Sequence, residues 1–153
     1  MRGKKDTAID IPNGDTAAGI SLVQFPFHGE ANQRWNVIAA ANGLYRFTSV
    51  HSKLALAATN DTLVQAKPDA ASANQLWGLR LSEDGFFSLI NGESRLSLEG
   101  EKEGLRILLR KPSDRELRQN WMLVNEARVA FSRDIPTDAK IPPPPPLQKP
   151  QNR

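Results

Sequence analysis

The tripeptides Gln33-Arg34-Trp35, Gln75-Leu76-Trp77 and Gln119-Asn120-Trp121 share the pattern Gln-x-Trp and contain all three tryptophans of the chain. The tryptophans are 42 and 44 residues apart, and ten residues after each comes another aromatic residue, at Tyr45, Phe87 and Phe131. Self-similarity at a period of about 20–50 residues is typical of repeat architectures. The chain is therefore predicted to contain three units of one kind.

Between the tripeptides the sequence has the pattern of short strands broken by turn residues, with no long helix. The clearest turn is Asn42-Gly43, the strongest short hairpin signal. Twelve strands are predicted, four in each unit, at residues 8–11, 22–25, 35–39, 44–49, 54–57, 63–67, 77–81, 86–90, 95–98, 106–110, 121–124 and 128–131. Short strands with frequent turns are typical of a closed all-β fold.

Units of this length cannot each bury a hydrophobic face, so they are predicted to share one core. Three four-stranded units around a pseudo-threefold axis would also leave few free sheet edges. The glutamine lies two positions before the tryptophan, on the same strand face, where its amide can bond to backbone groups in turns. The predicted structural core residues are Trp35, Gln75, Trp77, Gln119 and Trp121.

Composition argues against several classes of function. The net charge is only +3, and its one local excess is at Arg2, Lys4 and Lys5, so no nucleic-acid partner is predicted. The chain has no cysteine, and its only histidines are His28 and His51. No metal site, cofactor or histidine-based triad is therefore expected. No pair of carboxylates suggests a glycosidase, so the chain is predicted not to be an enzyme.

Targeting signals are equally sparse. Residues 1–15 lack the apolar core of a signal peptide, and no apolar run is long enough to span a membrane. The sequence as written fits the cytoplasm, whereas a leader outside it would make the protein secreted. The lack of cysteine fits a reducing compartment and does not decide the question.

The repeated Gln-x-Trp, the Asn-Gln before two of the tryptophans and the opening Ala-Ile-Asp-Ile-Pro-Asn-Gly at residues 8–14 resemble the ricin B-type β-trefoil lectin family. The resemblance covers about residues 8–131. It implies an all-β β-trefoil with three four-stranded repeats, at about residues 8–49, 50–91 and 92–134, called here the first, second and third units. It also implies a carbohydrate-binding, lectin-like module with a glycan partner, for which a galactose-like sugar is the default expectation.

In this family a sugar site lies within one unit and combines a carboxylate, a polar residue, an aromatic side chain and the Asn before Gln-x-Trp. Carboxylate and amide groups bond to sugar hydroxyls, and an aromatic face covers the apolar face of the ring. The first unit resembles this pattern throughout, and either Phe25 or Phe27 could be the aromatic platform. The predicted sugar-binding residues are Asp10, Gln24, Phe25, Phe27, His28, Asn32 and Gln33.

The other two units depart from the pattern. The second has Ala57 in place of Asp10 and Lys67 in place of an aromatic residue, and the third has Glu99 for the carboxylate but Arg118 for the asparagine. One working site in the first unit is therefore expected. The alternative is a degenerate trefoil that acts as a protein-interaction or inhibitor module without binding sugar. With one site, avidity would need an oligomer or a tethered domain.

The ends of the chain are predicted to lie outside the repeats. Residues 1–7 are expected to be a disordered basic N-terminus, and residues 8–134 the trefoil domain. Because residues 1–7 are too few and too polar for the opening strand of the first unit, residues 128–131 are predicted to fill its place; a first unit that is cut short is the alternative. Residues 135–153 hold Pro142 to Pro146 and are predicted to be a proline-rich tail or linker.

Overall fold

A computed structural model describes residues 7–82 and 85–122. This part of the chain folds as ten strands and five single-turn 3-10 segments, and it contains no α-helix. The strands are β1 (Thr7–Asp10), β2 (Val23–Pro26), β3 (Trp35–Ala39), β4 (Tyr45–Ser49), β5 (Ala55–Thr59), β6 (Thr62–Ala66), β7 (Trp77–Leu81), β8 (Phe87–Asn91), β9 (Ser97–Glu99) and β10 (Leu108–Arg110). The 3-10 segments are η1 (Pro12–Gly14), η2 (Ala31–Gln33), η3 (Ala41–Gly43), η4 (Ala73–Gln75) and η5 (Leu117–Gln119).

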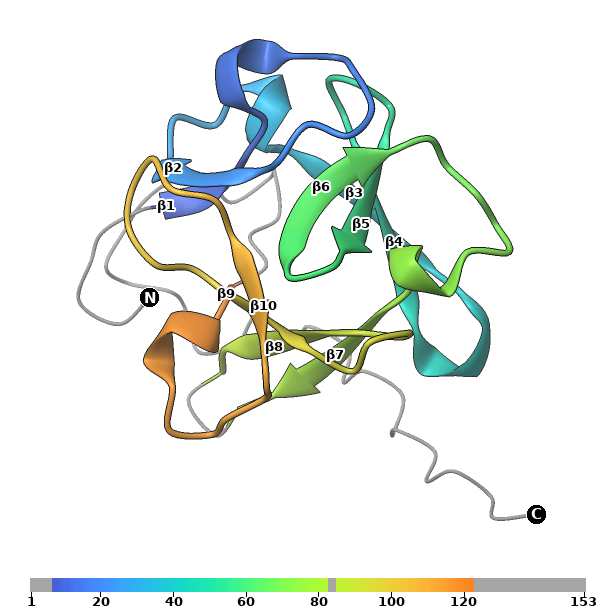
Figure 1. Cartoon of the computed structure of the whole chain (residues 1–153), viewed down its shortest axis with the longest axis vertical. Coiled ribbons are helices and arrows are strands. Elements are labelled where there is room, and N and C mark those ends of the chain that lie inside the picture. The colour runs from blue at the N-terminus through green and yellow to red at the C-terminus, as the bar shows by residue number, and fades with distance from the viewer. Residues whose placement is uncertain (1–6, 83–84, 123–153) are drawn as a thin grey trace, which may run out of the picture.

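The strands form three lobes around a common centre (Figure 1). Each lobe contains one antiparallel pair: β1–β2, β5–β6 or β9–β10. Strands β3 to β10 form one sheet in the order β3-β4-β5-β6-β10-β9-β8-β7. The sheet closes on itself where Tyr45 of β4 pairs with Trp77 of β7. Closure removes free sheet edges, which is the advantage expected of a three-unit all-β fold. The predicted β-trefoil architecture is confirmed.

The β3–β4 hairpin shows why the Asn-Gly signal was informative. Asn42 and Gly43 have φ angles of +60° and +72°, and the Leu44 N–H donates to the Ala41 carbonyl at 3.2 Å. Two successive positive φ angles define the type I′ turn, whose twist matches that of the flanking strands. Glycine and asparagine are the residues that adopt this conformation at least cost.

The three tryptophans make the same hydrogen bond in each unit. Each indole N–H donates to a backbone carbonyl of its own unit: Trp35 to Ile9 at 3.3 Å, Trp77 to Leu56 at 3.0 Å and Trp121 to Leu98 at 3.2 Å. Trp77 is fully buried in the shared core, whereas the other two indoles are partly buried and pack against it. The core is thus shared as predicted, but the three tryptophans contribute unequally to it.

The three glutamines also repeat one arrangement. Each side-chain amide donates to the carbonyl of a residue near the end of the preceding strand: Gln33 to Pro26, Gln75 to Lys67 and Gln119 to Lys111, at 2.8–2.9 Å. Each side-chain oxygen accepts a hydrogen bond from a backbone N–H in the loop between that strand and the glutamine. The donors are His28, Asp69 and Ser113, each at 2.9 Å. The amides therefore satisfy loop backbone groups, which is the role predicted from their position on the strand.

The predicted and observed strands differ mainly in the third unit. A strand was predicted from Arg95, but Arg95 has a φ of +61°, which a strand cannot contain, and β9 begins at Ser97. Residues 106 and 107 were predicted as part of the next strand; they bond instead to residues 22 and 23 of the first unit, before β10 begins at Leu108. Thr7 already belongs to β1.

Several predictions fall beyond the residues that the structure describes. They are the strand at residues 128–131 that would complete the barrel, the end of the trefoil domain at residue 134, the proline-rich tail, and the state of residues 1–6. The predicted strand at 121–124 is described only at its start, where Trp121 forms a β-bridge with Phe87.

Candidate functional site

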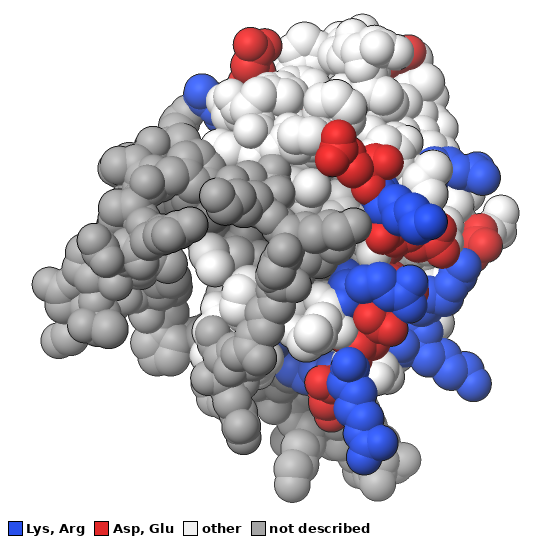
Figure 2. All heavy atoms as spheres, turned by 90° about the vertical axis from the view of Figure 1, so that its left-hand side faces the viewer, with Lys and Arg blue, Asp and Glu red and all other residues white. Residues whose placement is uncertain are grey.

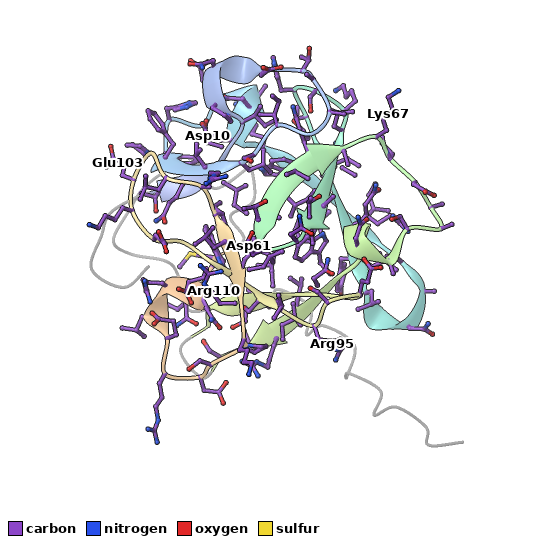
Figure 3. The ribbon with its side chains drawn as sticks, in the orientation of Figure 1. Asp10, Asp61, Lys67, Arg95, Glu103 and Arg110 are labelled. Atoms are coloured by element: carbon purple, nitrogen blue, oxygen red, sulfur yellow. The ribbon has the colours of Figure 1, made fainter. Side chains whose placement is uncertain are left out.

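A hollow of about 600 Å³ opens beside the end of β1 in the first unit. Four of the seven predicted site residues line it: Asp10, Phe25, His28 and Asn32. They come from different elements, because Asp10 ends β1, Phe25 lies in β2, and Asn32 lies in η2. Figure 3 shows Asp10 within the lobe of β1 and β2, on the side away from the centre of the molecule. The fold therefore assembles most of the predicted site in one place.

The carboxylate of Asp10 is the polar centre of the hollow. Its Oδ2 accepts hydrogen bonds from Gln33 Nε2 at 2.8 Å and from Asn32 Nδ2 at 3.1 Å, and it lies 3.3 Å from His28 Nε2. Only 4% of Asp10 is exposed, so a charge at this position needs such partners. Because these three donors converge on one oxygen, the carboxylate is fixed in a single orientation.

Two side-chain oxygen atoms at the hollow accept no hydrogen bond from the described residues. Asp10 Oδ1 receives no hydrogen bond from any described residue. Asn32 uses its Nδ2 for Asp10 and for the Ile11 carbonyl, both at 3.1 Å, and within residues 7–82 and 85–122 no donor reaches its side-chain oxygen. A carboxylate oxygen and an amide oxygen close together can accept from neighbouring hydroxyl groups.

Phe25 supplies an apolar surface next to these acceptors. It is 42% exposed, and its ring meets the ring of His28 edge to face, with 6.2 Å between the centroids. His28 is held from both sides, since its Nε2 lies at Asp10 and its Nδ1 accepts the Glu30 N–H at 3.3 Å. The exposed Phe25 face is therefore supported by a fixed neighbour.

The other three predicted residues do not line the hollow. Gln24 alternates with Phe25 along β2, so its side chain points to the opposite face, where it is buried and donates to Thr7 Oγ1 at 2.7 Å. Phe27 lies against Gly29. Gln33 stands behind Asp10, where it orients the carboxylate and holds the loop backbone. Of the two candidate platforms, Phe25 is the one at the hollow.

The second unit shows what is missing from an equivalent site. The hydrogen bonds of Trp77 and Gln75 correspond to those of Trp35 and Gln33. By this correspondence Ala57 is the equivalent of Asp10, and Ala66 is the equivalent of Phe25. The sequence had suggested Lys67 as the counterpart of the aromatic residue, but Lys67 corresponds to Pro26 and its side chain points to solvent (Figure 3). Asn74 is kept, donating to the Ala58 carbonyl at 3.2 Å, but it has no carboxylate beside it.

In the third unit the carboxylate is present but already bound. Glu99 is 6% exposed, and its two oxygens bond to Gln119 Nε2 at 3.0 Å and to Arg118 Nη2 at 3.2 Å. Arg118 stands at the position in the repeat that Asn32 has in the first unit. It also binds the second carboxylate oxygen, whereas that of Asp10 has no donor among the described residues. It also binds Glu116 at 2.9 Å, and this side-chain hydrogen bond lowers the pKa of Glu116 to about 2. Arg110 replaces the aromatic residue and pairs with Asp61 (Figure 3).

Two residues that line the hollow come from outside the first unit, and no sequence motif had indicated them. His51 follows β4 in the second unit, and its Nε2 lies 2.7 Å from the Gly14 carbonyl. Gly104, in the loop between β9 and β10, donates its N–H to the Gln24 carbonyl at 2.6 Å. Figure 3 shows Glu103 of the same loop beside the lobe of β1 and β2. No local pattern marks such residues, because only closure of the fold brings them to the hollow.

Charge on the surface is mixed. Figure 2 shows basic and acidic side chains interleaved on one part of the face in view. Ion pairs in the described part of the chain include Arg80–Asp114 and Arg110–Asp61. No group of three or more His, Asp or Glu residues able to hold a metal ion occurs in the described ranges. Among the same residues, no helix has the length and apolar character needed to cross a membrane.

The closed ring of strands, with three units that repeat the same tryptophan and glutamine bonds, defines the chain as a β-trefoil. Residues 2–71 match the family described as "Ricin-type beta-trefoil lectin domain-like". The resemblance to the ricin B-type β-trefoil lectin family is thereby confirmed. No curated protein matches the sequence significantly.

Solved structures agree with this fold. The designed three-fold symmetric protein ThreeFoil shares 27% sequence identity over 78% of this chain and 91% of its own, with a TM-score of 0.72. The ricin B-like lectin of Macrolepiota procera, solved in complex with lactose, shares 20% identity over 76% of this chain and 85% of its own (TM-score 0.61). SeviL, solved bound to asialo-GM1 saccharide, shares 17% sequence identity over 70% of this chain and 82% of its own (TM-score 0.58). The family match supports a carbohydrate-binding β-trefoil module, and these structures share its fold.

Proposed function

We propose that the protein is a non-catalytic, lectin-like module that binds a glycan in the hollow of its first unit. The observation that carries the proposal is the convergence of Asp10, Asn32 and the exposed ring of Phe25 on one hollow. A galactose-like sugar is the first candidate. The family match over residues 2–71 and the lactose complex of the Macrolepiota procera lectin support this choice.

The mechanism is reversible binding without chemistry. Asp10 Oδ1 and the side-chain oxygen of Asn32 accept hydrogen bonds from adjacent sugar hydroxyls, and Phe25 covers the apolar C–H face of the ring. Gln33 and His28 hold the carboxylate in place before the sugar arrives, which lowers the entropic cost of binding. A hydrogen bond to a charged acceptor contributes about 1.5–3 kcal/mol, a large part of the affinity of a weak sugar site.

We infer that the other two units do not bind sugar in this way. The second has Ala57 and Ala66 in place of the carboxylate and the ring, and the third has Arg118 bound to Glu99. A single weak site would then depend for avidity on an oligomer or on a tethered domain.

A second candidate function is a protein-interaction or inhibitor module. The observation in its favour is the surface of the third unit, where Arg118 pairs with Glu116 and Arg110 pairs with Asp61. Figure 2 shows basic and acidic side chains interleaved on one face of the molecule. Such a surface can recognise a partner with complementary charges. It makes no use of the hollow, so the two functions are separable by mutation.

A glycan array tests the first candidate. We expect wild type to bind galactose-containing glycans, and Phe25→Ala and Asp10→Asn each to reduce binding about tenfold or more. Phe25 is well exposed, so its replacement should leave the fold intact. Glu99→Gln is the matched control, because it changes the equivalent carboxylate of the third unit and should leave glycan binding unchanged. If wild type binds no glycan more tightly than Asp10→Asn does, the sugar-binding proposal is wrong.

A further inference from the structure

We propose that the hollow holds two linked sugar rings, and that His51 of the second unit is the residue that recognises the second ring. The inference rests on the proposed function of the first unit and extends it to the class of ligand, a disaccharide or the end of a longer glycan. The binding site would then combine residues of two units, because Asp10, Asn32 and Phe25 belong to the first unit and His51 belongs to the second.

The size of the hollow is the first argument. Its volume is about 600 Å³. Pockets for drug-sized ligands have volumes of about 300–1,000 Å³, and a hollow in the middle of this range can take a ligand larger than one hexose of about 12 non-hydrogen atoms. A single ring on Phe25 would leave a large part of the hollow unfilled.

The shape of the lining is the second argument. Phe25 pairs with Ala8 and Val23 with Asp10, so a ring that contacts both Phe25 and Asp10 spans two residues of β1, about 7 Å. The chain then continues past Asp10 into the turn at Asn13 and Gly14, which also lines the hollow. The hollow therefore extends from the proposed first ring along the chain direction, and His51 stands at this far end.

His51 is built into that position. Its backbone N–H bonds to Ser49 Oγ at 3.1 Å, and its Nε2 bonds to the Gly14 carbonyl at 2.7 Å. Gly14 has a φ of +62°, which is part of the turn that directs its carbonyl to the histidine. The ring is exposed, and within the described part of the chain its Nδ1 has no partner. A neutral ring that donates from Nε2 has an acceptor at Nδ1 for a sugar hydroxyl.

Phe25 is also open on its other side. It lies opposite Gly104 across the contact between β2 and the β9–β10 loop, because the Gly104 N–H bonds to the Gln24 carbonyl and Val23 pairs with Arg106. Gly104 has no side chain to cover the ring, and apart from Gly104 and its two chain neighbours no atom of the described residues lies within 4 Å of the place that a Cβ would occupy there. The first ring can therefore reach Phe25 while the second extends toward His51.

Isothermal titration with galactose and with lactose tests the inference, with glucose and cellobiose as a second pair. We expect wild type to bind the disaccharide of one pair about three- to tenfold more tightly than its monosaccharide. His51→Ala should remove this preference and change the monosaccharide affinity less than twofold. Lys67→Ala, a second-unit change outside the hollow, is the control and should retain the preference.

A structural role for His51 would give a different result. If His51 only anchors the Gly14 turn, His51→Ala should weaken both sugars equally and lower the thermal midpoint, and His51→Gln, which can keep the bond to Gly14, should restore both. That result, or equal affinity of wild type for the two sugars in each of the pairs, overturns the inference and leaves sugar binding by the first unit standing. If wild type binds none of the four sugars more tightly than Asp10→Asn does, this inference fails, and the proposed function fails with it only if no glycan of the array is bound either.

Discussion

Replacing Trp77 with alanine should cost the fold more than replacing either of the other tryptophans. Trp77 is completely buried, and its indole N–H bonds to the carbonyl of Leu56, which is itself 1% exposed. Trp77 lies in the second unit, where no sugar site is proposed. The effect of its removal therefore reports on the shared core alone.

The magnitude follows from two contributions. Truncating a buried tryptophan to alanine costs about 3–5 kcal/mol through lost burial and the cavity that remains. Leaving the Leu56 carbonyl without its partner adds about 1–3 kcal/mol. A typical domain is stable by only about 5–15 kcal/mol, so Trp77→Ala should leave the protein marginally folded or unfolded. Trp77→Phe keeps most of the ring and should lose mainly the hydrogen-bond part, about 1–3 kcal/mol.

Urea unfolding followed by circular dichroism measures these differences without depending on tryptophan fluorescence. Trp35→Ala is the matched control. Trp35 makes the same kind of bond, to Ile9 at 3.3 Å, but it is only partly buried, so its loss should cost about 2–3 kcal/mol. A loss below about 1.5 kcal/mol for Trp77→Ala, or an equal loss for Trp35→Ala, would show that Trp77 is not the centre of the shared core.

Three further predictions concern the same framework. Gln75→Ala should destabilise the protein by about 1–3 kcal/mol in urea unfolding, because it leaves loop backbone groups unpaired; an unchanged midpoint would contradict this role. Glu116 has a folded pKa of about 2 against an ordinary 4.5, so its stabilisation is present above about pH 4.5 and disappears as the pH falls toward 2. Arg118→Gln should flatten the dependence of stability on pH in that window, and an unaltered pH profile would exclude the pairing. Gly100→Ala should cost about 1–3 kcal/mol and lower the thermal midpoint, because its Cβ would overlap the Gln24 amide; a variant as stable as wild type would refute this close contact.

The fold could be predicted from the sequence because its main interactions lie within single units. The Trp35 bond to Ile9 and the Gln33 bond to Pro26 each join residues fewer than 30 positions apart, and the same bonds recur at a constant period. A pattern of this kind is visible along the chain. The same holds for Asp10 and Asn32, which sit at fixed places relative to the tripeptide and do meet in the structure.

The composition of the hollow depended on facts that a linear pattern does not contain. Strand alternation puts Phe25 at the hollow and Gln24 on the opposite face, and a shift of one residue would exchange them. Among the described residues Asp10 Oδ1 has no donor, whereas both oxygens of Glu99 are bound. The difference arises because the long side chain of Arg118 bonds to Glu99 Oε1, whereas Asn32 bonds to Asp10 only at Oδ2. His51 reaches the hollow from the next unit, because the closing of the ring brings together residues that share no local signal.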